Sequence, residues 1–201
     1  MMVQRRQLIC GVIATVLAGC GDGRPAVDPP VPTASSAPAA GRAGEASEKV
    51  LSAPQERRFG GIRMTVPAGW EEVPLKSDML LAEYKLEGDA GPGRLTLSTA
   101  GGGVEANISR WRGQFTPGEG DPSPAESSLT VDGHEAAVVE LFGSFQDGFG
   151  GGGVKPGWAM LGVVLPLKQA NFFCKLTGPR ATIEAQKEAV LEFVKSAKFE
   201  D

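Results

Sequence analysis

SLTVDGHEAAVVELFGSF, residues 128–145, is the clearest predicted β-hairpin in this chain of 201 residues. Two runs rich in apolar and β-branched side chains flank Asp132-Gly133. Because Asp-Gly favours the type I′ turn, which joins antiparallel strands tightly, the stretch predicts a turn at these two residues. We therefore expect the fold to be organised around an antiparallel sheet.

Shorter runs of alternating apolar and polar residues predict further strands on both sides of this hairpin. The run that begins near residue 62 and the runs at 80–86 and 94–99 are expected to form a three-stranded meander. After the hairpin, residues 158–165 and 171–177 supply two more strands. We therefore expect a sheet of six to seven strands.

Two segments instead repeat their apolar residues at the period of a helix. The first carries Val104, Ile108, Trp111 and Phe115 on one stripe, and the second carries Ile183, Val190, Val194 and Ala197. Glu184 is expected to open the second helix, and Lys195 and Lys198 to close it, in accord with the helix dipole. The order of three strands, a helix, four strands and a helix predicts an α+β domain in which helices cover an antiparallel sheet.

The N-terminus has the layout of a bacterial lipoprotein signal peptide. Arg5 and Arg6 precede an uncharged stretch, residues 8–18, which is too short to span the roughly 30 Å hydrocarbon core of a membrane as a helix. The ending Leu17-Ala18-Gly19-Cys20 resembles the lipobox. The resemblance implies that residues 1–19 are removed and that Cys20 is acylated by membrane lipid. A signal peptide with a chance cysteine is the alternative.

The residues after Cys20 indicate which membrane holds the lipid anchor and where the tether to the globular domain ends. The residue after Cys20 is Gly21, whereas an aspartate at this position would resemble an inner-membrane retention signal. We therefore expect the chain to be anchored on the periplasmic side of the outer membrane. Residues 20–57 are rich in Pro, Ala, Ser and Gly and lack apolar periodicity, which predicts a disordered tether. The globular domain is therefore expected to span residues 58–201.

Charge and motif content argue against several classes of function. The formal net charge of −4 disfavours a nucleic-acid partner, which would select a basic face. The sequence has no Gly-x-Ser-x-Gly, His-Glu-x-x-His or Cys-x-x-Cys pattern, and its one histidine, His134, is expected to be a solvated residue beside the turn. Cys174 lies in an apolar run and is expected to be buried. We therefore predict no catalytic, cofactor-binding or metal-binding residues, and a hydrolase without a sequence motif is the remaining enzymatic alternative.

Three short motifs resemble those of PsbP-like domains. Val66-Pro67-Ala68-Gly69-Trp70 is similar to the opening of such domains, and Leu176-Thr177-Gly178-Pro179 fits their end. Residues 107–115 look like the Asn-x-x-Arg-Trp-x-x-Gln-Phe helix of a group of uncharacterised bacterial envelope lipoproteins. The resemblance covers about residues 58–199. It implies an α/β/α sandwich and a binding or assembly role without enzymatic activity.

The first predicted helix is the candidate partner surface. Arg110, Arg112 and Gln114 lie around its apolar stripe, and Arg110 and Gln114, four residues apart, could contact one another or a carboxylate of a partner. In the alternative, the helix is purely structural and Arg110 pairs with an acid of the sheet. The glycine-rich residues 148–153 are a second candidate surface.

These patterns together predict a lipid-anchored, non-enzymatic module that binds another envelope protein or helps an envelope complex to assemble, without a cofactor. A carrier of small molecules or lipids, with a pocket between the sheet and a helix, is the alternative.

Overall fold

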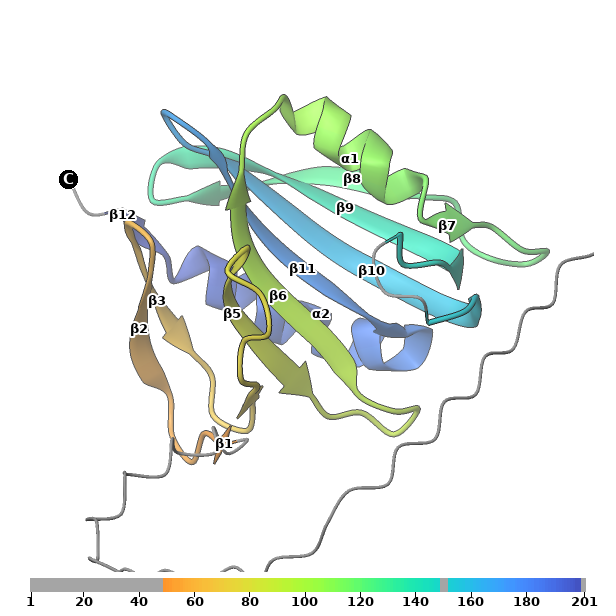
Figure 1. Cartoon of the computed structure of the whole chain (residues 1–201), viewed down its shortest axis with the longest axis horizontal. Coiled ribbons are helices and arrows are strands. Elements are labelled where there is room, and N and C mark those ends of the chain that lie inside the picture. Colours follow the sequence, from red (N-terminus) through yellow and green to blue (C-terminus); the bar gives the residue numbers. More distant parts are fainter. Residues whose placement is uncertain (1–48, 149–151, 200–201) are drawn as a thin grey trace, which may run out of the picture. The chain divides into compact units, whose positions relative to one another are not determined.

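Two antiparallel sheets and two helices make up the part of the chain that the computed structural model describes, residues 49–148 and 152–199 (Figure 1). The larger sheet contains β1 (Lys49–Val50), β4 (Glu71–Glu72), β5 (Leu80–Leu86), β6 (Gly93–Ala100), β7 (Phe115–Thr116), β8 (Ala125–Val131), β9 (His134–Phe145), β10 (Lys155–Pro166) and β11 (Asn171–Pro179). The smaller sheet contains β2 (Gln55–Phe59), β3 (Ile62–Val66) and β12 (Lys198–Phe199). The helices are α1 (Val104–Arg112) and α2 (Arg180–Lys195).

The α+β class is confirmed, but the strand count is wrong. The larger sheet has nine strands in the order β1-β4-β5-β6-β11-β10-β9-β7, with β8 also paired to β9. Three of its strands, β1, β4 and β7, have two residues each. A two-residue strand has no alternation of polar and apolar positions, so no pattern in the sequence could reveal it.

The predicted three-stranded meander is also wrong, because its first strand belongs to the smaller sheet. β3 pairs with β2 in the register Phe59↔Ile62 and with β12 in the register Lys198↔Arg63. Gly60, with a φ of 63°, provides the tight turn between β2 and β3. The other two strands, β5 and β6, do form the expected antiparallel pair.

The folded unit begins earlier than the boundary expected at residues 57 and 58. Leu51 is only 1 % exposed, and its backbone exchanges hydrogen bonds with Trp70 and Gly69 at 2.9 and 2.8 Å. β1 and β2 also lie before residue 58 or across it. Residues 49–57, assigned to the tether from composition, therefore belong to the fold. Cys20 and the predicted signal peptide, residues 1–19, lie outside the described residues.

The central hairpin is built as predicted. Val131 pairs with His134 across the turn, and Asp132 and Gly133 both have positive φ angles, 46° and 83°. Positive φ at both central residues is the signature of the type I′ turn.

The larger sheet separates two apolar cores, and the helices lie on its opposite faces (Figure 1). Along β10, Leu161 and Val163 join the core that contains α2, whereas Met160 and Val164 join the core that contains α1. This alternation follows from the two-residue period of a strand. No helix among the described residues has the length and apolar character needed to cross a membrane.

The end of α1 and the start of α2 differ from their predicted positions. α1 ends at Arg112 with Gly113 as its C-cap, so Phe115 lies in β7 although it still packs in the α1 core. α2 begins directly after Pro179 and has no acid in its first turn. Glu184 lies one turn further in and accepts a hydrogen bond from Arg180 Nε at 2.7 Å.

Candidate functional site

The sheet face that carries α1 is only partly covered. A nine-residue helix is about 13 Å long, and the core beneath α1 draws its strand residues from β7, β9, β10 and β11. In β6, Leu95 and Leu97 enter the opposite core with α2, so Thr96 and Ser98 are left on the face that α1 does not reach. A polar strip of sheet therefore lies open beside the helix.

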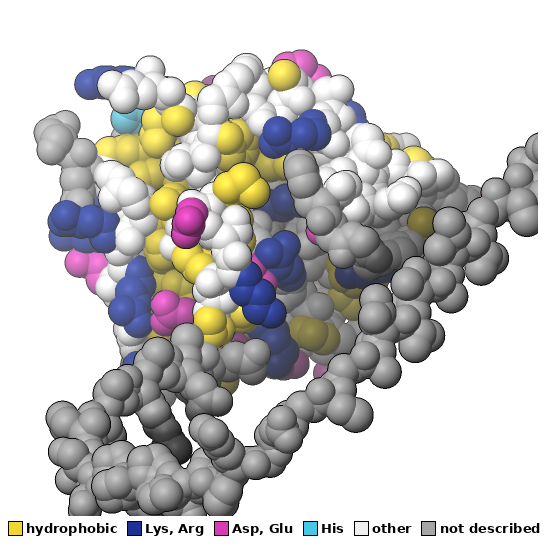
Figure 2. Space-filling model, viewed as in Figure 1, with side chains coloured by type: hydrophobic (Ala, Val, Ile, Leu, Met, Phe, Trp, Pro, Cys, Tyr) yellow, Lys and Arg dark blue, Asp and Glu magenta, His cyan; other side chains and the backbone are white. Residues whose placement is uncertain are grey.

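A groove of about 760 Å³ occupies this uncovered face. Its lining combines basic, acidic, hydroxyl and apolar side chains from α1, β5, β6, β9, β11 and three connecting segments: Ser77, Asp78, Met79, Leu80, Leu81, Arg94, Thr96, Ser98, Thr99, Ala100, Arg110, Trp111, Gln114, Phe145, Asp147, Lys175 and Thr177. The space-filling view shows basic and hydrophobic side chains intermixed on the side of the molecule that faces the viewer (Figure 2). Such a mixture suits a ligand that has both a charge and an apolar part.

Lys175 provides a partly buried positive charge in the groove. Its Nζ donates a hydrogen bond to Gln114 Oε1 at 2.7 Å and lies 5.6 Å from the centre of the Phe145 ring. Burial lowers the pKa of the Lys175 ammonium, Asp147 opposes this shift, and the positive charges of Arg94 and Arg110 add to it, so that the pKa is about 8. Lys175 is therefore mostly charged at pH 7 but is poorly solvated.

The two arginines of the groove are held in different ways. Arg94 donates from Nε and Nη2 to the two carboxylate oxygens of Glu83, at 2.8 and 2.7 Å, so its charge is already paired. Arg110 instead donates to the neutral Oδ1 of Asn107 at 2.9 Å. Asn107 is buried and donates in turn to the carbonyl of Gly103 at 2.9 Å. The positive charge of Arg110 is thus positioned without being neutralised by this partner.

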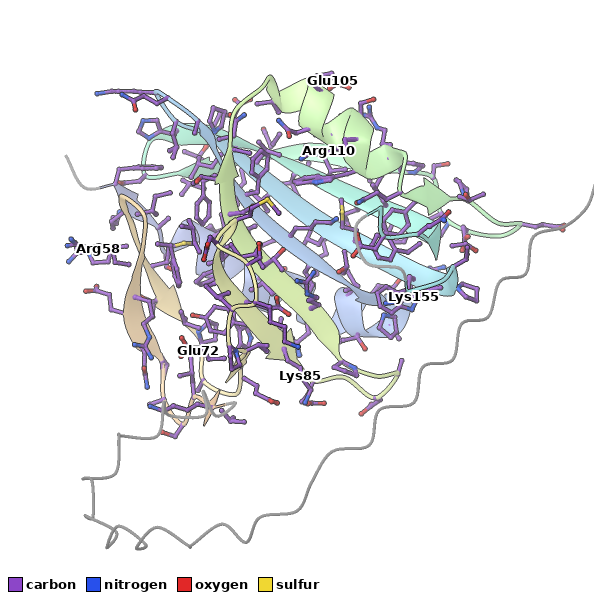
Figure 3. All side chains as sticks on the ribbon, viewed as in Figure 1. Arg58, Glu72, Lys85, Glu105, Arg110 and Lys155 are labelled. Carbon is purple, nitrogen blue, oxygen red and sulfur yellow. The ribbon has the colours of Figure 1, made fainter. Side chains whose placement is uncertain are left out.

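An aromatic stack supports one wall of the groove. The Phe145 and Trp158 rings are parallel, with centroids 5.5 Å apart, and Lys155 Nζ lies 4.2 Å from the Trp158 ring centre. Phe115 also contacts Phe145, at 5.1 Å between centroids. Figure 3 labels Arg110 on α1 and Lys155 at the start of β10. Stacked rings fix the wall in place, because each restricts the rotation of the next.

The predicted partner surface is divided by the structure. Arg110, in the last turn of α1, and Gln114, just past its end, both line the groove. Arg112 does not, because it forms ion pairs with Glu105, at 2.9 Å, and with Glu126. In the alternative, Arg110 is expected to pair with an acid of the sheet. The hydrogen bond that it forms is instead to Asn107, a neutral residue of α1 itself.

Every named residue of the Asn-x-x-Arg-Trp-x-x-Gln-Phe motif has a contact that explains it. Asn107 and Gln114 position the two cations described above, and Arg110 is one of those cations. Trp111 packs over Gly162 of β10, where an added Cβ would lie 2.5 Å from the indole ring. Phe115 fills the core beside Phe145. The motif therefore builds one side of the groove and attaches it to the sheet.

Sequence reasoning missed Lys175 and Arg94. The available signal was the alternation of polar residues in β6, Arg94, Thr96 and Ser98, together with one lysine inside the apolar run of β11. A strand with polar residues on one face is ordinarily solvated there. Only the short reach of α1 shows that these residues form a groove.

The remaining sequence candidates lie away from the groove lining. His134 is exposed, with Nδ1 3.1 Å from the Asp132 carbonyl oxygen and its ring 4.6 Å from that of Phe199. Cys174 is buried in the α2 core, and burial raises the pKa of its thiol. Within residues 49–148 and 152–199, no three His, Cys, Asp or Glu side chains are grouped to hold a metal ion. Part of the 148–153 loop is outside the described residues.

No protein-family model matches this chain, and no curated protein matches it. Solved structures do resemble it. The cyanobacterial PsbP of Synechocystis sp. PCC 6803 is 14 % identical with a TM-score of 0.49, and the match covers 80 % of this chain and 98 % of that one. The Ran-binding protein Mog1p of Saccharomyces cerevisiae is 11 % identical with a TM-score of 0.44, covering 73 % and 95 %.

A protein of Bacteroides thetaiotaomicron is 13 % identical with a TM-score of 0.47. That match covers 75 % of this chain but spans only about half, 49 %, of the Bacteroides chain. All three are similarities of the folded chain at low sequence identity.

Proposed function

We propose that this chain is a lipid-anchored, non-enzymatic binding module of the bacterial envelope that receives part of another envelope protein in the groove beside α1. The groove is the observation that supports this proposal, since it combines charged, hydroxyl and apolar groups on an otherwise uncovered sheet face. Its lining includes Met79, a large apolar side chain that is 75 % exposed. Exposed apolar groups beside unneutralised charge are typical of a recognition surface.

The membrane attachment belongs to the same proposal. Acylation of Cys20 by membrane lipid would hold the module on the periplasmic side of the outer membrane, as the lipobox-like sequence implies. The residues between Cys20 and β1 would then act as a spacer that lets the groove reach a neighbouring protein.

The finer architecture is proposed as a PsbP-like α/β/α sandwich. The support is the Asn-x-x-Arg-Trp-x-x-Gln-Phe motif, whose named residues all have contacts at the groove or in the core below it. The helices on opposite faces of the larger sheet are in accord with such a sandwich.

A carrier of small molecules is the second candidate, because about 760 Å³ lies within the usual range for ligand pockets, roughly 300–1,000 Å³. Carriers generally enclose most of their ligand. The groove is open along a wall that includes exposed Met79, Thr99 and Ala100, which favours a partner that remains largely outside it.

Photo-crosslinking in intact cells tests the binding role. We expect a photoreactive phenylalanine analogue in place of Met79 to capture one envelope protein in stoichiometric yield. The same analogue at Ala185, an exposed position on α2, should capture none of it. A pull-down of the wild type from detergent-solubilised membranes should recover the same protein. Recovery of the chain without a stoichiometric partner in both experiments contradicts the proposal.

A further inference from the structure

We propose that the groove recognises a carboxylate on an acidic peptide segment flanked by apolar residues, with the carboxylate bound between Lys175 Nζ and the Arg110 guanidinium. This inference rests on the proposed binding function and names the chemistry of the partner.

Lys175 has the capacity to bind an anion. A lysine ammonium has three hydrogen-bond donors, and one of them is used by Gln114. Among residues 49–148 and 152–199, no carboxylate oxygen lies within ion-pair distance of Nζ. Since a partly buried cation without an ion partner is poorly compensated, an incoming carboxylate would gain a charge-assisted hydrogen bond there.

Arg110 supplies the second positive group. Its hydrogen bond to Asn107 fixes the guanidinium while leaving other donors of the planar fork for a ligand. Arg94 is not assigned this role, because Glu83 already engages it through two oxygens. Gln114 bridges the two elements: it lies just past the end of α1 and holds the Lys175 ammonium of β11.

Two acids, Asp78 and Asp147, also line the groove and set its selectivity. Asp147 acts on Lys175 through space and stabilises its charged form. Both acids lie on loops, Asp78 before β5 and Asp147 after β9, whereas Lys175 lies in a strand of the sheet. A carboxylate is therefore attracted at the sheet and repelled at the loops, which favours a single acid seated on the floor over a run of acids.

The other lining groups favour a peptide over a free small acid. Thr96, Ser98 and Thr177 place hydroxyl groups along the floor, where backbone amides of an extended segment would find partners. Met79, which is exposed, and the half-buried Leu80 and Leu81 provide apolar surface for the residues on either side of the acid. The open side of the groove lets the segment enter and leave, as a partner protein requires.

Selection from a displayed library of random dodecapeptides tests the inference and does not require an identified partner. The full-length chain in detergent is the immobilised target. We expect the enriched peptides to share one Asp or Glu beside apolar residues. Enrichment of peptides without an acid, or no enrichment above an empty surface, overturns the inference.

Variants then locate the binding site, with fluorescence anisotropy of an enriched peptide as the measurement. Lys175→Met should weaken binding by about ten-fold or more, as expected for loss of a charge-assisted hydrogen bond. Lys195→Met, which removes an equally charged residue from the exposed end of α2, should change it less than two-fold, within the error expected for a distant surface site. Equal losses of affinity for both variants would show that binding depends only on the net charge of the chain, and would overturn the inference.

The pH dependence separates this role from a purely structural one. Because the pKa of Lys175 is about 8, binding by the wild type should weaken between pH 7 and 9.5. Lys175→Arg keeps a charge throughout this range and should bind with an affinity that is nearly independent of pH. A pH dependence that is the same in both proteins contradicts the assignment to Lys175.

Two further results distinguish this inference from the proposed function. Displacement of the peptide by hexanoate at similar concentrations assigns the groove to small amphiphilic acids and overturns the peptide assignment. If the Met79 crosslink to an envelope protein survives Lys175→Met at full yield, the binding function stands and the carboxylate inference fails. If peptides bind as expected but no envelope protein crosslinks, the carboxylate inference stands and the proposed binding function fails.

Discussion

At the scale of single residues, the groove depends on neutral side chains that position charged ones. Asn107 and Gln114 carry no charge, yet each accepts a hydrogen bond from a cation of the groove. A carboxylate in either place would neutralise the cation that it holds. An amide keeps the geometry and leaves the charge of the cation for a ligand. Gln114→Glu, which hardly changes the size of the side chain, should therefore still weaken anion binding, because the new carboxylate would neutralise Lys175.

The buried charge of Lys175 should affect stability in a pH-dependent way. Burial lowers its pKa from 10.5 to about 8, so the unfolded chain holds the proton more tightly than the folded chain. The wild type therefore gains stability as the pH rises from 8 towards 10.5. We expect the stability of Lys175→Met, relative to wild type, to fall between pH 7 and pH 10 in urea unfolding.

Lys195→Met is the control for this measurement. The Glu192 carboxylate raises the pKa of Lys195, so this residue loses its proton only above its usual range and gives no gain between pH 8 and 10. A relative stability of Lys175→Met that stays constant with pH would show that Lys175 is solvated like Lys195.

Gly162 should be intolerant of even one added methyl group. An added Cβ would lie 2.5 Å from Trp111, and the indole cannot move without displacing α1. Gly162→Ala is expected to lower the free energy of unfolding by about 1–3 kcal/mol, the usual cost of overpacking. Gly61→Ala, where nothing lies within 4 Å of an added Cβ, is the matched control. A smaller loss for Gly162→Ala in a Trp111→Leu background would locate the clash.

At the scale of elements, long and regular segments could be predicted from the sequence, and short or polar ones could not. The β8–β9 hairpin and both helices were expected because turn chemistry and apolar periods extend over many residues. β2, with the sequence QERRF, has one large apolar residue, so its polar composition resembles a tether. Its place in the fold depends on pairing with β3, a contact that no local pattern encodes.

Leu51 tests where the folded unit begins. If residues before β2 are part of the fold, Leu51→Ala should lower the free energy of unfolding by about 2–5 kcal/mol, the usual cost of truncating a buried leucine. Leu75, which is 45 % exposed, is the control, and Leu75→Ala should have a much smaller effect. Equal and small effects would return residues 49–54 to the tether.

At the scale of the whole molecule, the groove results from a mismatch between a short helix and a wide sheet. α1 has only nine residues and is about 13 Å long. The larger sheet has nine strands, so this one helix is too short to cover its face. The sequence revealed Arg110 of α1 and Gln114 just past the end of that helix, because both lie beside a recognisable apolar stripe. It did not reveal Lys175, since the strand order that brings β11 beside β6 is a property of the assembled sheet.

The anchoring of the whole chain should depend on one thiol. Cys20→Ser is expected to release the chain from membranes while its domain folds normally, because it removes the proposed site of acylation. Cys10→Ser, inside the predicted signal peptide, should leave membrane attachment unchanged. Fractionation of cell extracts at high salt measures both. A Cys20→Ser chain that still sediments with membranes would show that another segment holds it there.

Cys174 makes the centre of the sheet accessible to chemical measurement. It lies on β11, which is paired on one side with β6 and on the other with β10, and burial raises the pKa of its thiol. A thiol reagent can reach it only after the sheet has opened. In a chain with Cys10→Ser and Cys20→Ser, the rate of labelling therefore counts opening events. Any molecule that binds the folded state slows that rate in proportion to its occupancy, so thiol protection can identify a natural ligand before its chemistry is known.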